Sequence, residues 1–246
     1  MASIKVKFRA SGVAGHPGSI YYQIIHAKKV RQFLSGHRVY PDEWDEALST
    51  VAVVNRGERQ SLLVSVSECI RCELERLKRI AQRFDAIGQP YTADDVVNEF
   101  MRYVHEYSLF NFMEGIIARL QLQGKVRTAE TYKSTLNSFR KFRGGEDIVL
   151  DCLSSETMEA YEAWHRRRGV APNTISFYNR ILRAVYNRAV GKGVIDNRHP
   201  FSHVYTGIAK TVKRALPIAH IRKIKALDLA MALDFARDMF MMSFYL

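Results

Sequence analysis

The sequence predicts a mostly helical α+β protein, with a small three-stranded antiparallel sheet at its N-terminus and a four-helix domain in its second half. Three observations predict this fold class. Apolar and charged residues alternate in segment 4–9, as on a half-buried strand. Apolar residues then recur at helical spacing from about residue 58. Gly124, the Gly144-Gly145 pair and Gly169 separate the later helical patterns.

The N-terminal module is expected to span residues 1–55. Segment 4–9 places its apolar side chains on one face and its cations on the other. Segments 19–27 and 30–34 supply two further strands, and a hairpin is expected at Lys28-Lys29. Pro41 then indicates a helix start, because proline suits a first turn and acidic residues follow it.

Residues 56–106 are expected to form linker helices. One amphipathic helix is predicted from Glu58 to Ile87, where Gly88-Gln89-Pro90 supplies a stop. Thr92 and Asp95 have the spacing of a capping box, which opens a second, shorter helix through about His105.

The four-helix domain is expected within residues 107–200. Its predicted helices cover 108–123, 128–142, 154–167 and 172–190. A further helical region follows within 201–246 and ends in a helix from Asp228 to Leu246. That helix has no glycine cap, and its apolar end at 239–246 is expected to need a cover.

The net charge of +12 is concentrated in two blocks. Residues 1–40 carry +7 and residues 166–214 carry +10, whereas residues 41–165 carry −6. Two blocks almost free of acidic residues favour a polyanionic partner over a merely solvated surface. No secretory signal or membrane span is visible, which indicates a cytoplasmic protein without a membrane partner. Three cysteines without a second Cys-x-x-Cys are expected to be reduced.

The predicted DNA-contacting residues lie on two helices and on the sheet. Helix 172–190 has an apolar stripe opposite a polar side that lacks acidic residues, and arginine, asparagine and serine are side chains that contact bases and phosphates. The helical candidates are Asn173, Ser176, Arg180, Arg183, Asn187 and Arg188, the neighbouring Arg166, Arg167 and Arg168, and, on helix 128–142, Lys133, Asn137, Arg140 and Lys141.

The sheet offers a second set of candidates, since a small sheet can lie against a DNA groove. These candidates are Lys5, Lys7, Arg9, Tyr21, Gln23, Lys28, Lys29, Arg31 and His37. The pattern leaves open which face of the sheet meets DNA, and the tyrosines fit the core equally well.

No catalytic constellation is present in the sequence. It contains no His-Glu-x-x-His motif, glycine-rich phosphate loop or Gly-x-Ser-x-Gly elbow. His199 and His203 have ligand-like spacing, but Pro200 lies between them and no third ligand is evident, so no metal site is expected.

The order of these modules resembles the tyrosine recombinases, in particular the integrases of conjugative transposons and related mobile elements. Segments 4–9, 20–24 and 40–44 resemble the arm-binding domain of that family. Thr131-Tyr132, Leu136-Asn137, Phe139 and segment 173–189 resemble its SAM-like core-binding domain. Segment 216–227 resembles the entry into its catalytic domain, of which residues 201–246 would be the truncated beginning.

The resemblance implies that the protein binds double-stranded DNA at arm and core sites and self-associates there in its full-length form. A tyrosine of the catalytic domain would attack the scissile phosphate, with no metal or nucleotide cofactor. Neither Lys225 nor Tyr245 matches a catalytic position of the family, so the catalytic residues are expected beyond Leu246 and the chain itself is expected to be inactive.

Two alternatives remain open from the sequence. One is a complete, non-enzymatic DNA-binding protein, either a transcription regulator or an architectural protein. The other is a protein-interaction module whose positive charge only maintains solubility.

Overall fold

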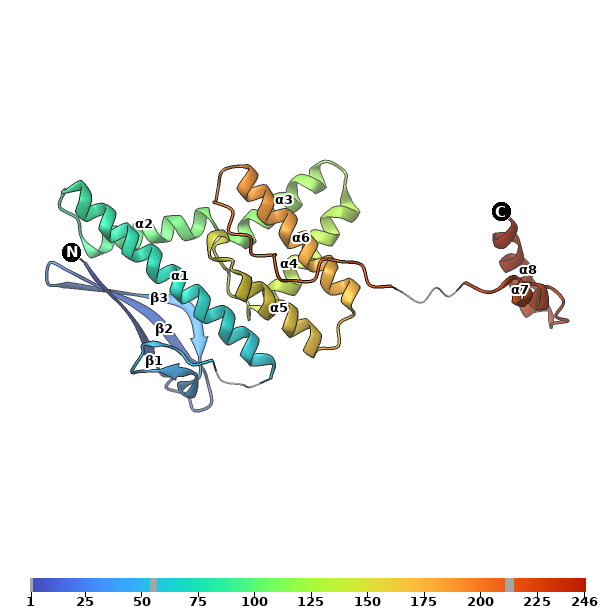
Figure 1. Cartoon of the computed structure of the whole chain (residues 1–246), viewed down its shortest axis with the longest axis horizontal. Coiled ribbons are helices and arrows are strands. Elements are labelled where there is room, and N and C mark those ends of the chain that lie inside the picture. Colours follow the sequence, from blue (N-terminus) through green and yellow to red (C-terminus); the bar gives the residue numbers. More distant parts are fainter. Residues whose placement is uncertain (1, 54–56, 211–214) are drawn as a thin grey trace. The chain divides into compact units, whose positions relative to one another are not determined.

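A computed structural model describes residues 2–53, 57–210 and 215–246. The chain divides into two compact units, residues 1–208 and residues 209–246. The first unit holds the sheet and six helices, α1 to α6, and the second holds α7 and α8 (Figure 1). The predicted α+β, mostly helical class is confirmed.

The N-terminal sheet consists of β1 (Ser3–Arg9), β2 (Gly18–His26) and β3 (Lys29–Val39), antiparallel in the order β1-β2-β3. The predicted hairpin forms one residue earlier than expected. His26 pairs with Lys29, and the turn residues Ala27 and Lys28 have φ angles of 48° and 64°. These positive angles are those of a two-residue hairpin turn whose twist matches the flanking strands.

The predicted helix at Pro41 is wrong beyond its first turn. Pro41–Glu43 forms a single 3-10 turn, and the chain then enters a short hairpin of β4 (Trp44–Asp45) and β5 (Thr50–Val51). Trp44 is buried and stacks on Phe8 of β1, with ring centroids 5.9 Å apart. Burial of this ring against the sheet overrides the local helix signal.

The long helix α1 (Glu58–Ile87) lies between the sheet and the helical domain (Figure 1). On the sheet side, the Tyr22 hydroxyl of β2 donates a 2.6 Å hydrogen bond to Glu73. On the opposite side, α1 packs along α5. Helix α2 (Ala93–Glu106) begins at the predicted capping box of Thr92 and Asp95, and its Phe100 packs edge-on against Tyr22.

The prediction that all three cysteines are reduced is wrong for two of them. Cys72 on α1 is joined in a disulfide to Cys152 in η2 (Leu150–Cys152), and Cys69 remains free and buried. The two bonded cysteines are 80 residues apart in sequence. Sequence spacing alone does not show such a pair, because only the packing of η2 against α1 brings the two sulfurs together.

The four predicted helices of the next region are confirmed. They are α3 (Leu109–Leu122), α4 (Val126–Phe142), α5 (Ser155–Arg167) and α6 (Pro172–Gly191). Ser108 and Ser154 cap α3 and α5 by accepting hydrogen bonds from backbone N–H groups of the first turn. The core that the four helices share includes the buried residues Leu136, Phe139, Tyr161 and Leu182.

The second unit contains α7 (Ile218–Lys225) and α8 (Met231–Tyr245). The last helix therefore starts three residues after the predicted Asp228. Many of its apolar side chains are exposed, whereas Met241 is buried. Among the described residues, no helix is both long and apolar enough to cross a membrane.

Candidate nucleic-acid interface

One side of α4 forms the wall of a surface groove. Lys133, Asn137 and Lys141 follow one another at intervals of four residues and are all exposed. The groove has a volume of about 530 Å³. Its other lining side chains come from α4, α5, α6 and the loop between the last two; they are Glu130, Ser134, Ser138, Trp164, His165, Arg168, Val170 and Tyr178.

The floor of this groove is aromatic and uncharged at neutral pH. His165 is only 4% exposed and stacks on Tyr178, with ring centroids 5.1 Å apart. Its Nε2 lies 3.1 Å from the Ser138 hydroxyl. Burial, aided by the positive charge of Arg168, lowers the pKa of His165 to about 4. The positive charge of the groove therefore comes from Lys133, Lys141 and Arg168.

Arg140 lies apart from these residues. Its guanidinium donates a 2.9 Å hydrogen bond to Glu114 of α3 and lies 4.9 Å from the centre of the Phe110 ring. Although Arg140 shares α4 with Lys133, Asn137 and Lys141, its side chain joins α4 to α3 and does not line the groove.

The three consecutive arginines at the C-terminal end of α5 have three different surroundings. Arg166 donates 2.6 and 3.0 Å hydrogen bonds to Glu162, one turn earlier. Arg167 donates to Ser61, Gln60 and the Gly57 carbonyl at the start of α1. Arg168 lies over the Trp164 ring, 4.7 Å from its centre, at the groove. Of the three, only Arg168 joins the α4 residues.

The polar side of α6 is partly covered by the chain that follows it. Ser176 is 0% exposed, and its hydroxyl donates a 2.5 Å hydrogen bond to the Gly207 carbonyl. Asn179 beside it donates to the Tyr205 carbonyl. Ser176 therefore does not lie on an accessible surface, contrary to its prediction, because segment 205–207 packs along this edge of α6.

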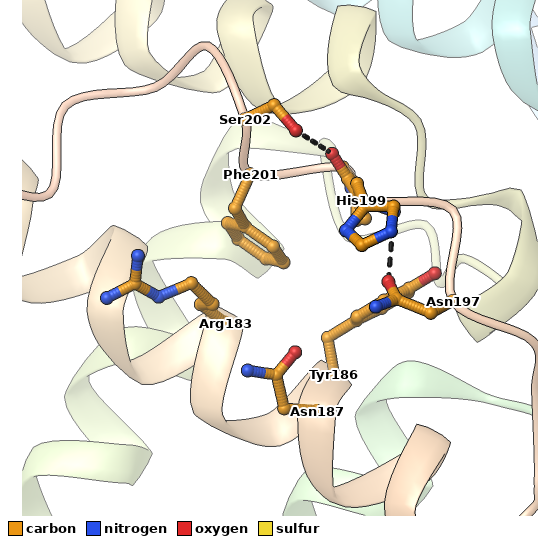
Figure 2. A pocket seen from close by; sticks show the side chains of 8 residues that line it. Arg183, Tyr186, Asn187, Asn197, His199, Phe201 and Ser202 are labelled. Atoms are coloured by element: carbon orange, nitrogen blue, oxygen red, sulfur yellow. Dashed lines mark hydrogen bonds between the residues drawn. The ribbon is translucent and has the colours of Figure 1, made fainter.

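The remaining α6 candidates differ in exposure. Arg180, Arg183, Asn187 and Arg188 are exposed, whereas Asn173 is half-buried. Arg183 and Asn187 line a second hollow, of about 260 Å³, between α6 and segment 197–202. Figure 2 shows the two side chains on the helix beneath the loop that carries Phe201 and His199, with the Arg183 guanidinium directed away from His199.

The loop side of this hollow is held by local hydrogen bonds (Figure 2). The Asn197 side chain accepts a 3.0 Å bond from the His199 backbone N–H, and the Ser202 hydroxyl donates a 2.8 Å bond to the His199 carbonyl. His199 has a φ of 52°, in the left-handed region. The hollow combines basic and amide side chains without a carboxylate among its lining residues.

The four helices and the loop that packs back on α6 account for one compact segment of the chain. Residues 108–204 match the family model of the phage integrase SAM-like domain. This confirms the predicted SAM-like domain and supports a DNA-binding, recombinase-related function. Comparison with curated proteins and with solved structures found no match.

The α4 groove lies within this SAM-like domain. So do the exposed α6 residues Arg180, Arg183, Asn187 and Arg188. The groove's aromatic residues Trp164, His165 and Tyr178 are absent from the sequence-based candidates. Their spacing on two different helices gives no signal of a shared floor, and only the packing of α5 against α6 creates one.

Outside the SAM-like domain, the structure leaves one face of the N-terminal sheet open. Val6, Tyr22 and Ile24 are buried on the face that packs against α1 and α2. Lys5 and Arg9 are exposed and Lys7 is half-buried on the opposite face, where Tyr21 and Gln23 pair with Lys7 and Lys5 across the strands. Hence the open face is the cationic one, and Tyr22 belongs to the core while Tyr21 does not.

Four other sheet candidates lie away from this open face. Lys28 and Lys29 are exposed at the hairpin tip. Arg31 is exposed on the α2 side, where its guanidinium lies 2.8 Å from Asp94. His37 is only 2% exposed and its Nε2 lies 3.6 Å from Glu73, so it sits in the core and cannot reach DNA from there. On β3 it shares a face with Phe33 and Val39 at two-residue spacing, and this face packs against α1 and α2. The sequence pattern does not reveal this, because it leaves open which face of the sheet meets DNA.

The part of the chain that the structure describes contains one cluster of potential metal ligands: Cys72, Asp151 and Cys152. The two sulfurs are bonded to each other, and Asp151 accepts hydrogen bonds from Arg76 and Tyr103. A metal ion requires free thiolates and a free carboxylate, and here all three groups are already engaged.

Proposed function

We propose that this chain binds double-stranded DNA as part of a site-specific tyrosine recombinase that integrates or excises a mobile element. The observation that carries the proposal is the groove of the SAM-like domain, where Lys133, Lys141 and Arg168 gather beside Asn137. Cationic side chains neutralise phosphates and supply most of the affinity for DNA, while an asparagine can pair with adenine.

Helix α6 carries a second set of exposed polar and basic side chains in the SAM-like domain. Arg180, Asn187 and Arg188 are exposed on this helix. Arg183 donates a 3.4 Å hydrogen bond to Thr206, which holds it at the edge of the hollow shown in Figure 2. We assign α4 and α6 together to the crossover, or core, site.

The open face of the sheet supplies the second proposed contact, which we assign to arm-type sites. Its cations are Lys5, Lys7 and Arg9 on β1 and Arg38 on β3, and they share the face with neutral side chains. A module that contacts a separate DNA site raises the effective concentration of the other module at its own site. In the full-length protein, self-association on DNA would bring the DNA-binding modules of several copies to neighbouring sites.

The strand cleavage expected of this family uses a tyrosine nucleophile and needs no metal or nucleotide cofactor. No residue between 1 and 246 is assigned to that step. The role proposed for this chain is recognition and positioning of the DNA.

Salt-dependent binding tests the proposal. Fluorescence anisotropy with a labelled random-sequence duplex should show an affinity loss on the order of 10³-fold between 50 and 200 mM salt, if roughly six phosphates are contacted. The double variant Lys133→Ala/Lys141→Ala should bind more weakly and reduce the slope of log affinity against log salt by about 2.

The matched control is Lys78→Ala/Arg79→Ala, which removes two exposed cations from α1. It should leave both the affinity and the slope close to wild type. Equal losses in the control and in the α4 variant would show that binding follows net charge alone, and salt-independent binding would contradict the proposed function altogether.

A further inference from the structure

The open face of the sheet carries a row of neutral side chains beside its cations. Gln23 of β2 and Gln32 of β3 are directly opposite each other, and Lys5 of β1 is opposite Gln23 on its other side. The next row on the same face consists of Lys7, Tyr21 and Leu34. In these two rows the side chains therefore change from cations on β1 to glutamine and leucine on β3, while Arg38 of β3 lies in the following row, opposite Ser19.

Two aliphatic residues on this face are exposed to an unusual degree. Leu34 is 64% exposed and Val30 is 54% exposed, and they flank Gln32 at two-residue spacing on β3. A hollow of about 410 Å³ lies beside them and is lined by Arg9, Ser19, Tyr21, Gln32, Phe33 and Leu34. Contacts with phosphates alone would use the cations and leave these side chains without a partner.

The dimensions of the sheet match those of a DNA groove. Neighbouring strands lie about 4.8 Å apart, so β1 lies roughly 10 Å from β3. The major groove is about 12 Å wide. When β2 and β3 occupy the centre of the groove, the cations of β1 fall at its wall, where the phosphates are.

The base edges at the centre of the groove would then meet Gln23, Gln32 and Leu34. A glutamine can form two hydrogen bonds with adenine, through N6 and N7, and an aliphatic side chain contacts the thymine methyl group. Both partners belong to A·T pairs. A guanine contact through O6 and N7 requires arginine or lysine at the centre. In the rows of Gln32 and Leu34 those residues lie on β1, and Arg38 of β3 lies in the following row, opposite Ser19.

We infer that the open face of β2 and β3 reads A·T base pairs in the major groove, with Gln23 and Gln32 contacting adenine and Leu34 contacting a thymine methyl group. This inference rests on the proposed binding of DNA by the sheet. It adds a sequence preference and names the three side chains that produce it.

The experiment begins with selection of duplexes from a random library by the whole chain. Duplexes bound through the sheet should contain A·T pairs, and replacement of one of these by G·C should weaken binding about tenfold. Gln32→Ala should bring the ratio of the two affinities close to one. The matched control Gln121→Ala, an exposed glutamine of α3, should keep the ratio.

The variant Lys5→Ala/Lys7→Ala distinguishes the inference from the function on which it rests. It should weaken binding to both duplexes equally and lower the salt slope, since phosphate contacts are indifferent to sequence. If this variant binds like wild type, the sheet does not contact DNA, and both the sheet's proposed role and the A·T preference are wrong.

If the lysine variant weakens binding but Gln23→Ala, Gln32→Ala and Leu34→Ala all keep the wild-type ratio, only the inference fails. Selection of G·C pairs by the sheet, or of no pairs at all, would likewise overturn it while leaving DNA binding intact.

Discussion

Cys72 of α1 and Cys152 of η2 form a disulfide, with their Cα atoms 5.6 Å apart. The bond attaches the long helix that supports the sheet to the middle of the SAM-like domain, just before α5. It lies beside Asp151, which is hydrogen-bonded to Arg76 of α1 and to Tyr103 of α2. Covalent and polar contacts therefore meet at one junction between α1, α2 and the domain.

Removal of this disulfide should destabilise the protein. Cys152→Ser is expected to lower the free energy of unfolding by about 2–4 kcal/mol, because the bond restricts a long loop of the unfolded chain. Urea denaturation without reductant measures the change. A reductant should lower the stability of the wild type in the same way and leave the variant unchanged.

A thiol count checks the pairing directly. Unfolded protein that has not been reduced should react with a thiol reagent at one cysteine, Cys69, because the other two are bonded. Reaction of all three cysteines would contradict the disulfide.

Substitutions of Ser176 and Arg180 should distinguish an effect on stability from an effect on DNA binding at α6. Ser176→Ala removes the donor to the Gly207 carbonyl and is expected to cost about 1 kcal/mol of stability, with the DNA affinity unchanged. Arg180→Ala alters an exposed position and should do the opposite, weakening DNA binding without a change in stability. Thermal unfolding and anisotropy on the same two variants decide, and a loss of affinity in Ser176→Ala would place that hydroxyl at the DNA.

Substitutions of Arg167 and Arg168 should likewise affect different properties, the first stability and the second DNA affinity. Arg167→Ala should lower the stability by about 1 kcal/mol, since its guanidinium bonds Ser61, Gln60 and the Gly57 carbonyl at the start of α1. Arg168→Ala should have the larger effect on DNA affinity, because Arg168 lines the groove. Denaturation and binding curves measured side by side test this division; the reverse order of effects would refute it.

Stability should decrease with acidification because of His165. The unfolded chain takes up a proton at this residue near the ordinary pKa of about 6.5, whereas burial in the folded protein lowers the pKa to about 4. The unfolded state thus binds more protons between these values, and this residue contributes stability above pH 6.5 that is lost as the pH falls toward 4.

The expected slope from His165 is up to about 1.4 kcal/mol per pH unit. Denaturation of the wild type and of His165→Gln between pH 7 and pH 5 measures it as a difference, which cancels the contribution of the other histidines. Parallel pH profiles for the two proteins would show that His165 does not retain a lowered pKa.

Local sequence determined most of the secondary structure. The bounds of α1, of α2 and of the four helices of the SAM-like domain follow from apolar spacing, from caps such as Thr92, Ser108 and Ser154, and from glycines such as Gly124. These signals act within one or two turns of chain, so they can be read without knowledge of the neighbours. Pro41 is the exception, because burial of Trp44 against Phe8 outweighs the local preference.

Only the tertiary structure decided which candidate side chains are accessible. Ser176 has a helical position that faces outward by periodicity, yet segment 205–207 covers it. His37 lies in a β-rich, cationic segment, yet it is on the face of β3 that packs against α1, beside Glu73. The groove floor of Trp164, His165 and Tyr178 and the pairing of Cys72 with Cys152 likewise depend on residues far apart in the chain. Periodicity shows which direction a side chain takes from its own helix or strand, whereas its burial depends on which distant segment packs there.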